Sequence, residues 1–196
     1  MRRFLVFLVL LMLAACGGGG GGSIGGIDSR LTRLDGYTAQ QLRVLGNPAQ
    51  GTPGLPQAAM GDLPPSGHVD FAGFATLRVE NPGVQRVLYG NATLQIGFGA
   101  DASSGTLDGF FGNDAAGDLV DYAGSVALAG GPMGQGGALG YTGSLTAPDA
   151  ALTLDGQVDV MLLGAPLSAV AASDLEATVG FNGADQDATL VIVAER

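Results

Sequence analysis

The chain has 196 residues, 46% of them hydrophobic, which is enough for one domain with a sizeable core and not comfortably for two. It carries 18 acidic residues against eight arginines and no lysine, a net charge of −10. A surface of that sign repels phosphate backbones and anionic lipid, so composition argues against nucleic-acid binding. Simple solubility accounts for the charge, and recognition of a basic partner is the functional alternative.

Residues 1–15 have the features of a lipoprotein signal peptide. Residues 1–3 are basic, residues 4–13 form an unbroken apolar run, and Ala14 and Ala15 are the small residues that a signal peptidase accepts. The run is too short to span a bilayer, which takes about 20 apolar residues. Small residues leading into Cys16 resemble a bacterial lipobox. The resemblance implies diacylation of the Cys16 thiol, cleavage before it and acylation of the new amino group. An ordinary secretory peptide is the alternative.

Cys16 is the only cysteine, so lipidation leaves no thiol for a disulfide or for thiol chemistry. A multiply acylated terminus anchors firmly, because stable residence in a membrane takes two or more chains. The processed chain has six arginines against 18 acidic residues, a net charge of −12. Gly17 is not the Asp that usually signals inner-membrane retention in such lipoproteins, so we expect the outer membrane, in either leaflet.

Residues 16–66 are predicted to form a tether. Glycines dominate residues 17–26, and a segment without side chains has nothing to bury. Apolar residues then recur at helical spacing, but Asp35-Gly36 interrupts the register, so we expect one or two short helical turns at most. Five prolines and four glycines make residues 47–67 a linker. Arg30, Arg33 and Arg43 lie in the tether and face either lipid headgroups or the acidic domain.

From residue 67 onward the hydrophobic period changes to two, the pattern of half-buried strands. Eight such segments are separated by short loops: residues 69–79, 88–98, 105–111, 119–129, 138–146, 151–163, 173–181 and 188–194. Residues 165–172 are the one place after residue 67 where a helical turn is expected. Because the connections are uniformly hairpin-like, we predict an all-β, eight-stranded antiparallel up-and-down barrel over residues 67–196, with a two-sheet sandwich as the alternative.

Short glycine-aromatic patterns carry a family resemblance: residues 64–75, Tyr89-Gly90, residues 105–109, Tyr122-Ala123-Gly124 and Tyr141-Thr142-Gly143. They resemble the eight-stranded barrel of transferrin-binding-protein-B-like surface lipoproteins, a fold also found in factor-H-binding-protein-like lipoproteins. The resemblance covers residues 64–196 and implies an outer-membrane lipoprotein that presents loops to another protein. The chain departs from transferrin binders, which have two lobes with handle domains, so transferrin binding and ligand-contact residues are not carried over.

Three patterns bear on catalysis or metal binding. Asp-Gly pairs at residues 35, 108 and 155 lack the Asp-Thr/Ser-Gly form of an aspartic protease. The two later pairs lie within alternating strands and fit strand or bulge positions with an outward carboxylate better. Asp114, Asp118 and Asp121 resemble a fragment of the glycine-rich calcium nonapeptide, which works only as stacked repeats, so an acidic hairpin loop is the simpler interpretation. His68 is the only histidine, too few for a histidine-based zinc site or a serine-histidine triad.

We therefore expect a non-enzymatic, cofactor-free, lipid-anchored module that docks a protein partner. Structural envelope lipoprotein and lipocalin-like carrier are the alternatives, and an interior cavity would favour the carrier. Large inward residues argue for a filled barrel: Leu88, Leu94, Phe98, Tyr122, Val126, Tyr141, Leu154 and Val158. Partner contacts are expected in the loops around Asp101, Asp114, Gly134 and Asp185. Tyr89 is expected to be either an exposed anchor for a partner or a wall tyrosine that lies over a neighbouring strand. Arg78 and Glu80 are expected to form an exposed ion pair.

Overall fold

The computed structural model describes residues 28–80 and 85–196. The predicted signal peptide, Cys16, the glycine stretch and residues 81–84 between the first two predicted strands lie outside these residues. The elements before the barrel are α1 (Ser29–Leu45), β1 (Gly46–Asn47), the 3-10 turn η1 (Pro48–Gln50), β2 (Thr52–Pro53) and the 3-10 turn η2 (Met60–Asp62).

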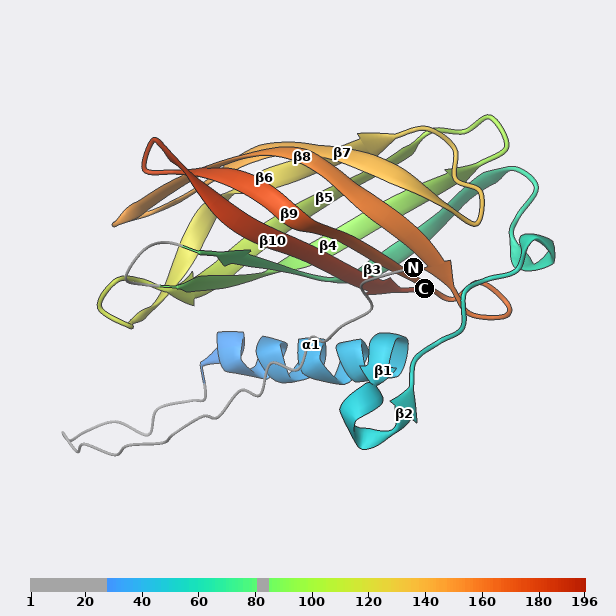
Figure 1. Cartoon of the computed structure of the whole chain (residues 1–196), viewed down its shortest axis with the longest axis horizontal. Helices are drawn as coiled ribbons and strands as arrows, with labels where there is room; N and C mark the ends of the chain where they lie inside the picture. The colour runs from blue at the N-terminus through green and yellow to red at the C-terminus, as the bar shows by residue number, and fades with distance from the viewer. Residues whose placement is uncertain (1–27, 81–84) are drawn as a thin grey trace, which may run out of the picture.

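Eight long strands alternate between buried and exposed residues, and Figure 1 shows them wrapped into one barrel. They are β3 (Gly67–Val79), β4 (Arg86–Phe98), β5 (Ser103–Asn113), β6 (Leu119–Gly130), β7 (Gly136–Ala147), β8 (Ala150–Leu163), β9 (Ala169–Phe181) and β10 (Ala184–Glu195). Each strand pairs antiparallel with the next, and β10 returns to pair with β3. The closed up-and-down barrel is therefore confirmed, and the sandwich is wrong.

One predicted helical turn is replaced by strand. Residues 165–172 were expected to contain helix, but β9 already begins at Ala169. Ala169 and Val170 pair with β8 on one side and with β10 on the other, so the sheet supplies their backbone hydrogen bonds. Only the residues directly before Ala169 form a turn, which joins β8 to β9.

The interior of the barrel is filled by side chains. Every position predicted to point inward is buried, with at most 3% of its surface exposed: Leu88, Leu94, Phe98, Tyr122, Val126, Tyr141, Leu154 and Val158. They belong to one core cluster that draws on all eight strands. An eight-stranded barrel has an interior just wide enough for side chains of this size.

The helix α1 is longer than the sequence predicts. It runs for 17 residues through Asp35-Gly36, where a break was expected, and Asp28 caps it by accepting a hydrogen bond from the Arg30 backbone N–H at 2.9 Å. The helix lies along the outer face of the barrel (Figure 1). Val44 is fully buried there, against a second apolar cluster that includes Phe74 and Val193. Tertiary packing of this kind outweighs the helix-breaking tendency of one glycine.

Residues 55–66, which we call the strap, are docked on the barrel and do not form the free linker predicted for them. Ala58 is fully buried in the main core, and its backbone N–H donates to the Leu162 carbonyl at 2.9 Å. Gln57 bridges to Leu163, and the Gly164 N–H donates to the Pro56 carbonyl. The strap therefore crosses the barrel end where β4, β6 and β8 finish. We call this the strap end.

Gly36 tests whether α1 is a continuous helix. A Cβ atom added there meets nothing within 4 Å, so Gly36→Ala keeps all contacts and removes the cost of a glycine in a helix interior. We expect the free energy of unfolding, measured by urea titration, to rise by about 0.5–1 kcal/mol. Gly51→Ala is the control, since Gly51 also has open space but sits in the left-handed region, where alanine is disfavoured. No gain at Gly36 would contradict a docked, continuous helix.

Candidate functional site

Arg86 occupies the opposite end of the barrel and was missed by the sequence analysis. Its side chain is only 5% exposed, and its Nη2 lies 2.6 Å from an Asp149 carboxylate oxygen. Its Nη1 donates to the Tyr122 hydroxyl at 2.9 Å and to the Asn113 carbonyl at 3.2 Å. The guanidinium also lies 5.5 Å from the centre of the Phe181 ring. Four strands and a turn are thus tied together at what we call the Arg86 end.

The ion pair shifts the titration of the groups around it. Hydrogen bonding from Arg86 lowers the pKa of Asp149 below its usual value, helped by the Ala115 backbone N–H. Burial raises the pKa of Tyr122, and the hydrogen bond from Arg86 opposes that rise. The signal for this site was present in the sequence, because Arg86 lies two residues before the inward Leu88 on the same face of its strand.

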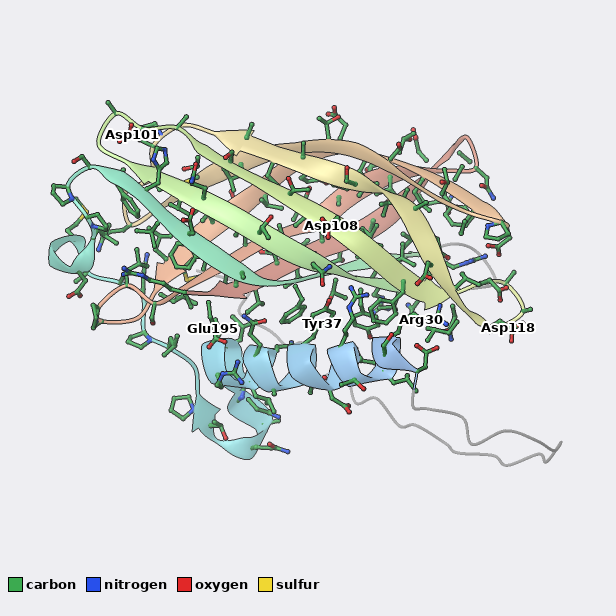
Figure 2. All side chains as sticks on the ribbon, turned by 180° about the vertical axis from the view of Figure 1, so that it is seen from behind. Arg30, Tyr37, Asp101, Asp108, Asp118 and Glu195 are labelled. Atoms are coloured by element: carbon green, nitrogen blue, oxygen red, sulfur yellow. The ribbon has the colours of Figure 1, made fainter. Side chains whose placement is uncertain are left out.

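Helix α1 forms the main polar contact surface on the outer wall (Figure 2). Arg30 pairs with Asp121 on β6 at 3.4 Å, and Arg43 pairs with Glu195 on β10 at 2.6 Å. Arg33 lies between them and contacts β4 and β5. The sequence left open whether these arginines face lipid or the acidic domain, and in the structure all three face the barrel.

Arg33 is held by a cup on the outer wall. Its Nη2 donates to the Gly109 carbonyl at 2.9 Å and to the Asn91 Oδ1 at 3.1 Å. Its guanidinium carbon lies 4.8 Å from the centre of the Phe111 ring. Tyr37, one turn along the helix, accepts from Arg33 at 3.1 Å and donates to Asn91 at 2.8 Å. We call Asn91, Gly109 and Phe111 the guanidinium cup.

The cup depends on a bulge in β5. The register between β5 and β6 shifts between Asp108 and Phe110, and Gly109 takes a φ of +56° there. A Cβ atom at Gly109 would lie 2.8 Å from the Asn91 amide nitrogen, so only glycine fits without strain. Asp108 accepts from that amide at 3.1 Å, which turns the Asn91 oxygen toward Arg33. The strand or bulge position predicted for the Asp108-Gly109 pair is confirmed.

The aromatic residues beside the cup belong to the wall. Tyr89 is paired with Phe111 across β4 and β5, with ring centres 5.9 Å apart, and burial raises its pKa. Of the two predicted roles for Tyr89, the wall tyrosine lying over a neighbouring strand is confirmed. Tyr37 stacks on Phe74 at 5.0 Å, so the helix covers an aromatic strip of the barrel.

The predicted calcium residues are not gathered into a ligand group. The Asp114 carboxylate accepts hydrogen bonds from the backbone N–H groups of Ala116 and Asp118, and Asp121 faces Arg30. In the part of the chain that the structure describes, no three His, Cys, Asp or Glu side chains come together as a metal would require.

The four loops proposed for partner contacts divide between the two barrel ends. The loops around Asp101 and Gly134 lie at the strap end, and those around Asp114 and Asp185 at the Arg86 end. Asp101 accepts from the Gly67 backbone N–H at 2.8 Å, so its carboxylate stabilises the start of β3. Elsewhere on the surface, Arg78 pairs with Glu80 at 2.6 Å as predicted.

The barrel interior also holds one polar pair. The Tyr141 hydroxyl donates to Asp174 at 2.9 Å, and its ring lies over Gly156, where a Cβ atom would clash with it. Burial raises the pKa of Tyr141, and the hydrogen bond to Asp174 adds to that rise. Tyr141 spans from β7 across β8 to β9, where the ladder between β8 and β9 is interrupted.

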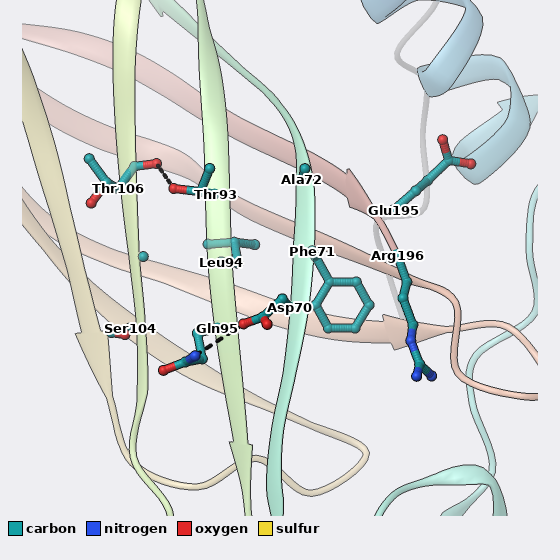
Figure 3. Close-up of a pocket in the computed structure, with 11 residues that line it drawn as sticks. Asp70, Phe71, Ala72, Thr93, Leu94, Gln95, Ser104, Thr106, Glu195 and Arg196 are labelled. Carbon is teal, nitrogen blue, oxygen red and sulfur yellow. Dashed lines mark hydrogen bonds between the residues drawn. The ribbon is translucent and has the colours of Figure 1, made fainter.

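Two depressions lie on the outer wall. The larger, of about 610 Å³, is a shallow hollow over β3, β4 and β5, and Figure 3 shows Asp70, Thr93, Gln95 and Thr106 along it, with Glu195 and Arg196 at one side. The smaller, of about 420 Å³, lies over β7, β8 and β9 and is lined by threonines and aspartates. Both are formed largely by outward-facing residues and lie outside the packed interior.

The fold and these sites define a closed, filled antiparallel barrel with a helix docked on its outer wall. Within residues 28–80 and 85–196, no helix is both long and apolar enough to cross a bilayer. Comparison of the chain with protein-family models, with curated proteins and with solved structures gives no match.

The pair at the Arg86 end makes a prediction about stability. Arg86→Met leaves Asp149 without its cation and removes the contacts to Tyr122, so we expect the free energy of unfolding to fall by about 3 kcal/mol. Arg78→Met is the matched control, because that pair is partly exposed and its loss should change stability by about 0.5 kcal/mol at most. Urea titration of both variants measures the difference, and equal effects would contradict a stabilising role for the Arg86 end.

Proposed function

We propose that this protein is a lipid-anchored outer-membrane lipoprotein whose barrel docks another protein through its outer wall and loops. The observation that carries this proposal is that the interior is filled and both ends are covered, by Arg86 at one and by the strap at the other. A partner protein would therefore be recognised by the outer wall and the loops. The resemblance to transferrin-binding-protein-B-like lipoproteins supports the same function, because it implies an eight-stranded barrel that presents loops to a partner.

The position of α1 limits how far the barrel can stand from the membrane. Only 11 residues, 17–27, separate the predicted anchor Cys16 from Asp28. A fully extended chain spans at most about 3.6 Å per residue, so this segment reaches about 40 Å. Figure 2 places Arg30 and Asp118 at one end of the barrel and Asp101 at the other. Because the chain reaches the barrel at the Arg86 end, we place that end toward the membrane and assign partner contacts to the strap end and the outer wall.

The carrier alternative has less support. A lipocalin-like carrier needs room for a ligand inside the barrel, whereas the positions that would line it hold large packed side chains such as Phe98, Phe110 and Tyr122.

Labelling with palmitate tests the anchor. Wild-type protein should incorporate label and sediment with outer membranes, and Cys16→Ala should lose both properties because the acceptor thiol is gone. Gly17→Asp is the matched control, since it should keep the label and move the protein to the inner membrane. Label retained in Cys16→Ala would refute the lipoprotein proposal.

Surface display is tested by protease treatment of intact cells. A protein that docks an external partner should be cleaved before the cells are lysed, and one that faces the periplasm should be protected. Protection in intact cells with cleavage after lysis would remove the external partner from the proposal and leave the periplasmic side.

A further inference from the structure

We propose that the guanidinium cup of Asn91, Gly109 and Phe111 is an arginine-binding site that Arg33 fills within the chain and that an arginine of a basic partner fills when α1 moves away. The cup supplies what a guanidinium needs: an aromatic face at 4.8 Å and two oxygen acceptors at 2.9 and 3.1 Å. The identity of the partner rests on the proposed docking function, whereas the site itself does not.

The cup is built by the barrel and not by the helix. Gly109 and Phe111 belong to β5 and Asn91 to β4, and their positions are fixed by the bulge and by the hydrogen bond from Asn91 to Asp108. Phe111 is 1% exposed with the helix in place. The cup therefore keeps its shape when Arg33 leaves, and it then opens to solvent.

The half of α1 that carries Arg33 is the more easily displaced. The C-terminal half is held by apolar burial around Val44, whereas the N-terminal half is held by exposed hydrogen bonds of Arg30 and Arg33 and by the contact of Arg33 with the Phe111 ring. Exposed polar contacts are individually weak. Arg33 competes as an attached ligand at a high effective concentration, so an incoming arginine must come from a partner that makes further contacts.

Charge selects a basic partner for this site. Asp108 and Asp121 lie beside the cup, and Asp121 is freed when Arg30 leaves with the helix. The chain as a whole has a net charge of −10. An arginine-bearing segment is therefore attracted to the wall and matches the cup, whereas a lysine lacks the planar group that stacks on Phe111 and bonds both oxygens.

The site is tested with methylguanidinium on the full-length protein, with methylammonium at the same ionic strength as the control probe. Arg33→Ala empties the cup, so methylguanidinium should bind saturably and shift the NMR signals of the Gly109 and Asn91 amides, about tenfold more tightly than in wild type. Adding Asn91→Ala to Arg33→Ala should weaken binding about tenfold, and adding Phe111→Leu about fivefold.

Arg43→Ala is the matched control, because Arg43 contacts one carboxylate and leaves no cup behind, so it should gain no binding. A folded Arg33→Ala variant that binds neither probe, or both equally, would overturn the site. If methylguanidinium binds as expected, a peptide with one arginine among serines and glycines should bind the Arg33→Ala variant about tenfold more tightly than the wild-type protein. The same peptide with lysine in place of arginine should bind both proteins equally. An arginine peptide without that preference would overturn the partner and leave the lipoprotein proposal unaffected.

Discussion

The pairing of β10 with β3 is the constraint on which the rest of the structure depends. It closes the sheet over eight residue pairs, from Val79 opposite Ala188 to Ala72 opposite Glu195. Closure at eight strands removes unpaired edges and leaves an interior that side chains fill. Because the inside is occupied, the outer wall and the ends are the surfaces left for function. Arg86 and the strap then cover the ends, so the wall is the largest free surface.

The wall is apolar where α1 covers it. Phe74 and Val193 point outward and are nevertheless buried, with 3% and 0% of their surface exposed. Complete burial of a side chain such as Val44 contributes about 1.5–3 kcal/mol, more than the glycine at position 36 costs the helix. At the other half of the helix the contacts become polar and end in the guanidinium cup. The same helix is thus fixed at one end and displaceable at the other.

Much of the barrel could be predicted from the sequence because apolar and polar residues alternate along a half-buried strand. The eight segments, the hairpin connections and the inward residues all follow from that pattern, although the strands extend beyond it into Ser, Gly and Ala positions. Helix α1 could not be predicted in full, since its stability comes from the outward Phe74 and Val193, which look like exceptions to strand alternation. Residues 47–66 were predicted to be a linker because they are rich in proline and glycine, and nothing in that composition indicates that one residue, Ala58, is buried.

The functional residues were harder to predict for a related reason. Arg86 is a charge at an inward strand position, and Asn91, Gly109 and Phe111 come together only through a bulge and a strand register that the sequence does not state. Arg33 was noted as part of a basic segment, but its contacts depend on the path of the helix over the wall. Outward aromatic residues such as Phe74 and Phe111 are the signal that a covering element exists.

Hydrogen exchange of the α1 amides in the full-length protein tests the docked helix most directly, because the burial of Val44 and the placement of Arg33 both depend on it. We predict strong protection from Tyr37 to Leu45 and weaker protection from Thr32 to Gly36, with Arg33→Ala lowering the latter and sparing the former. Exchange of the whole segment at the rate of a free peptide, in wild type as well as in the variant, would contradict the docked helix and the occupation of the guanidinium cup by Arg33.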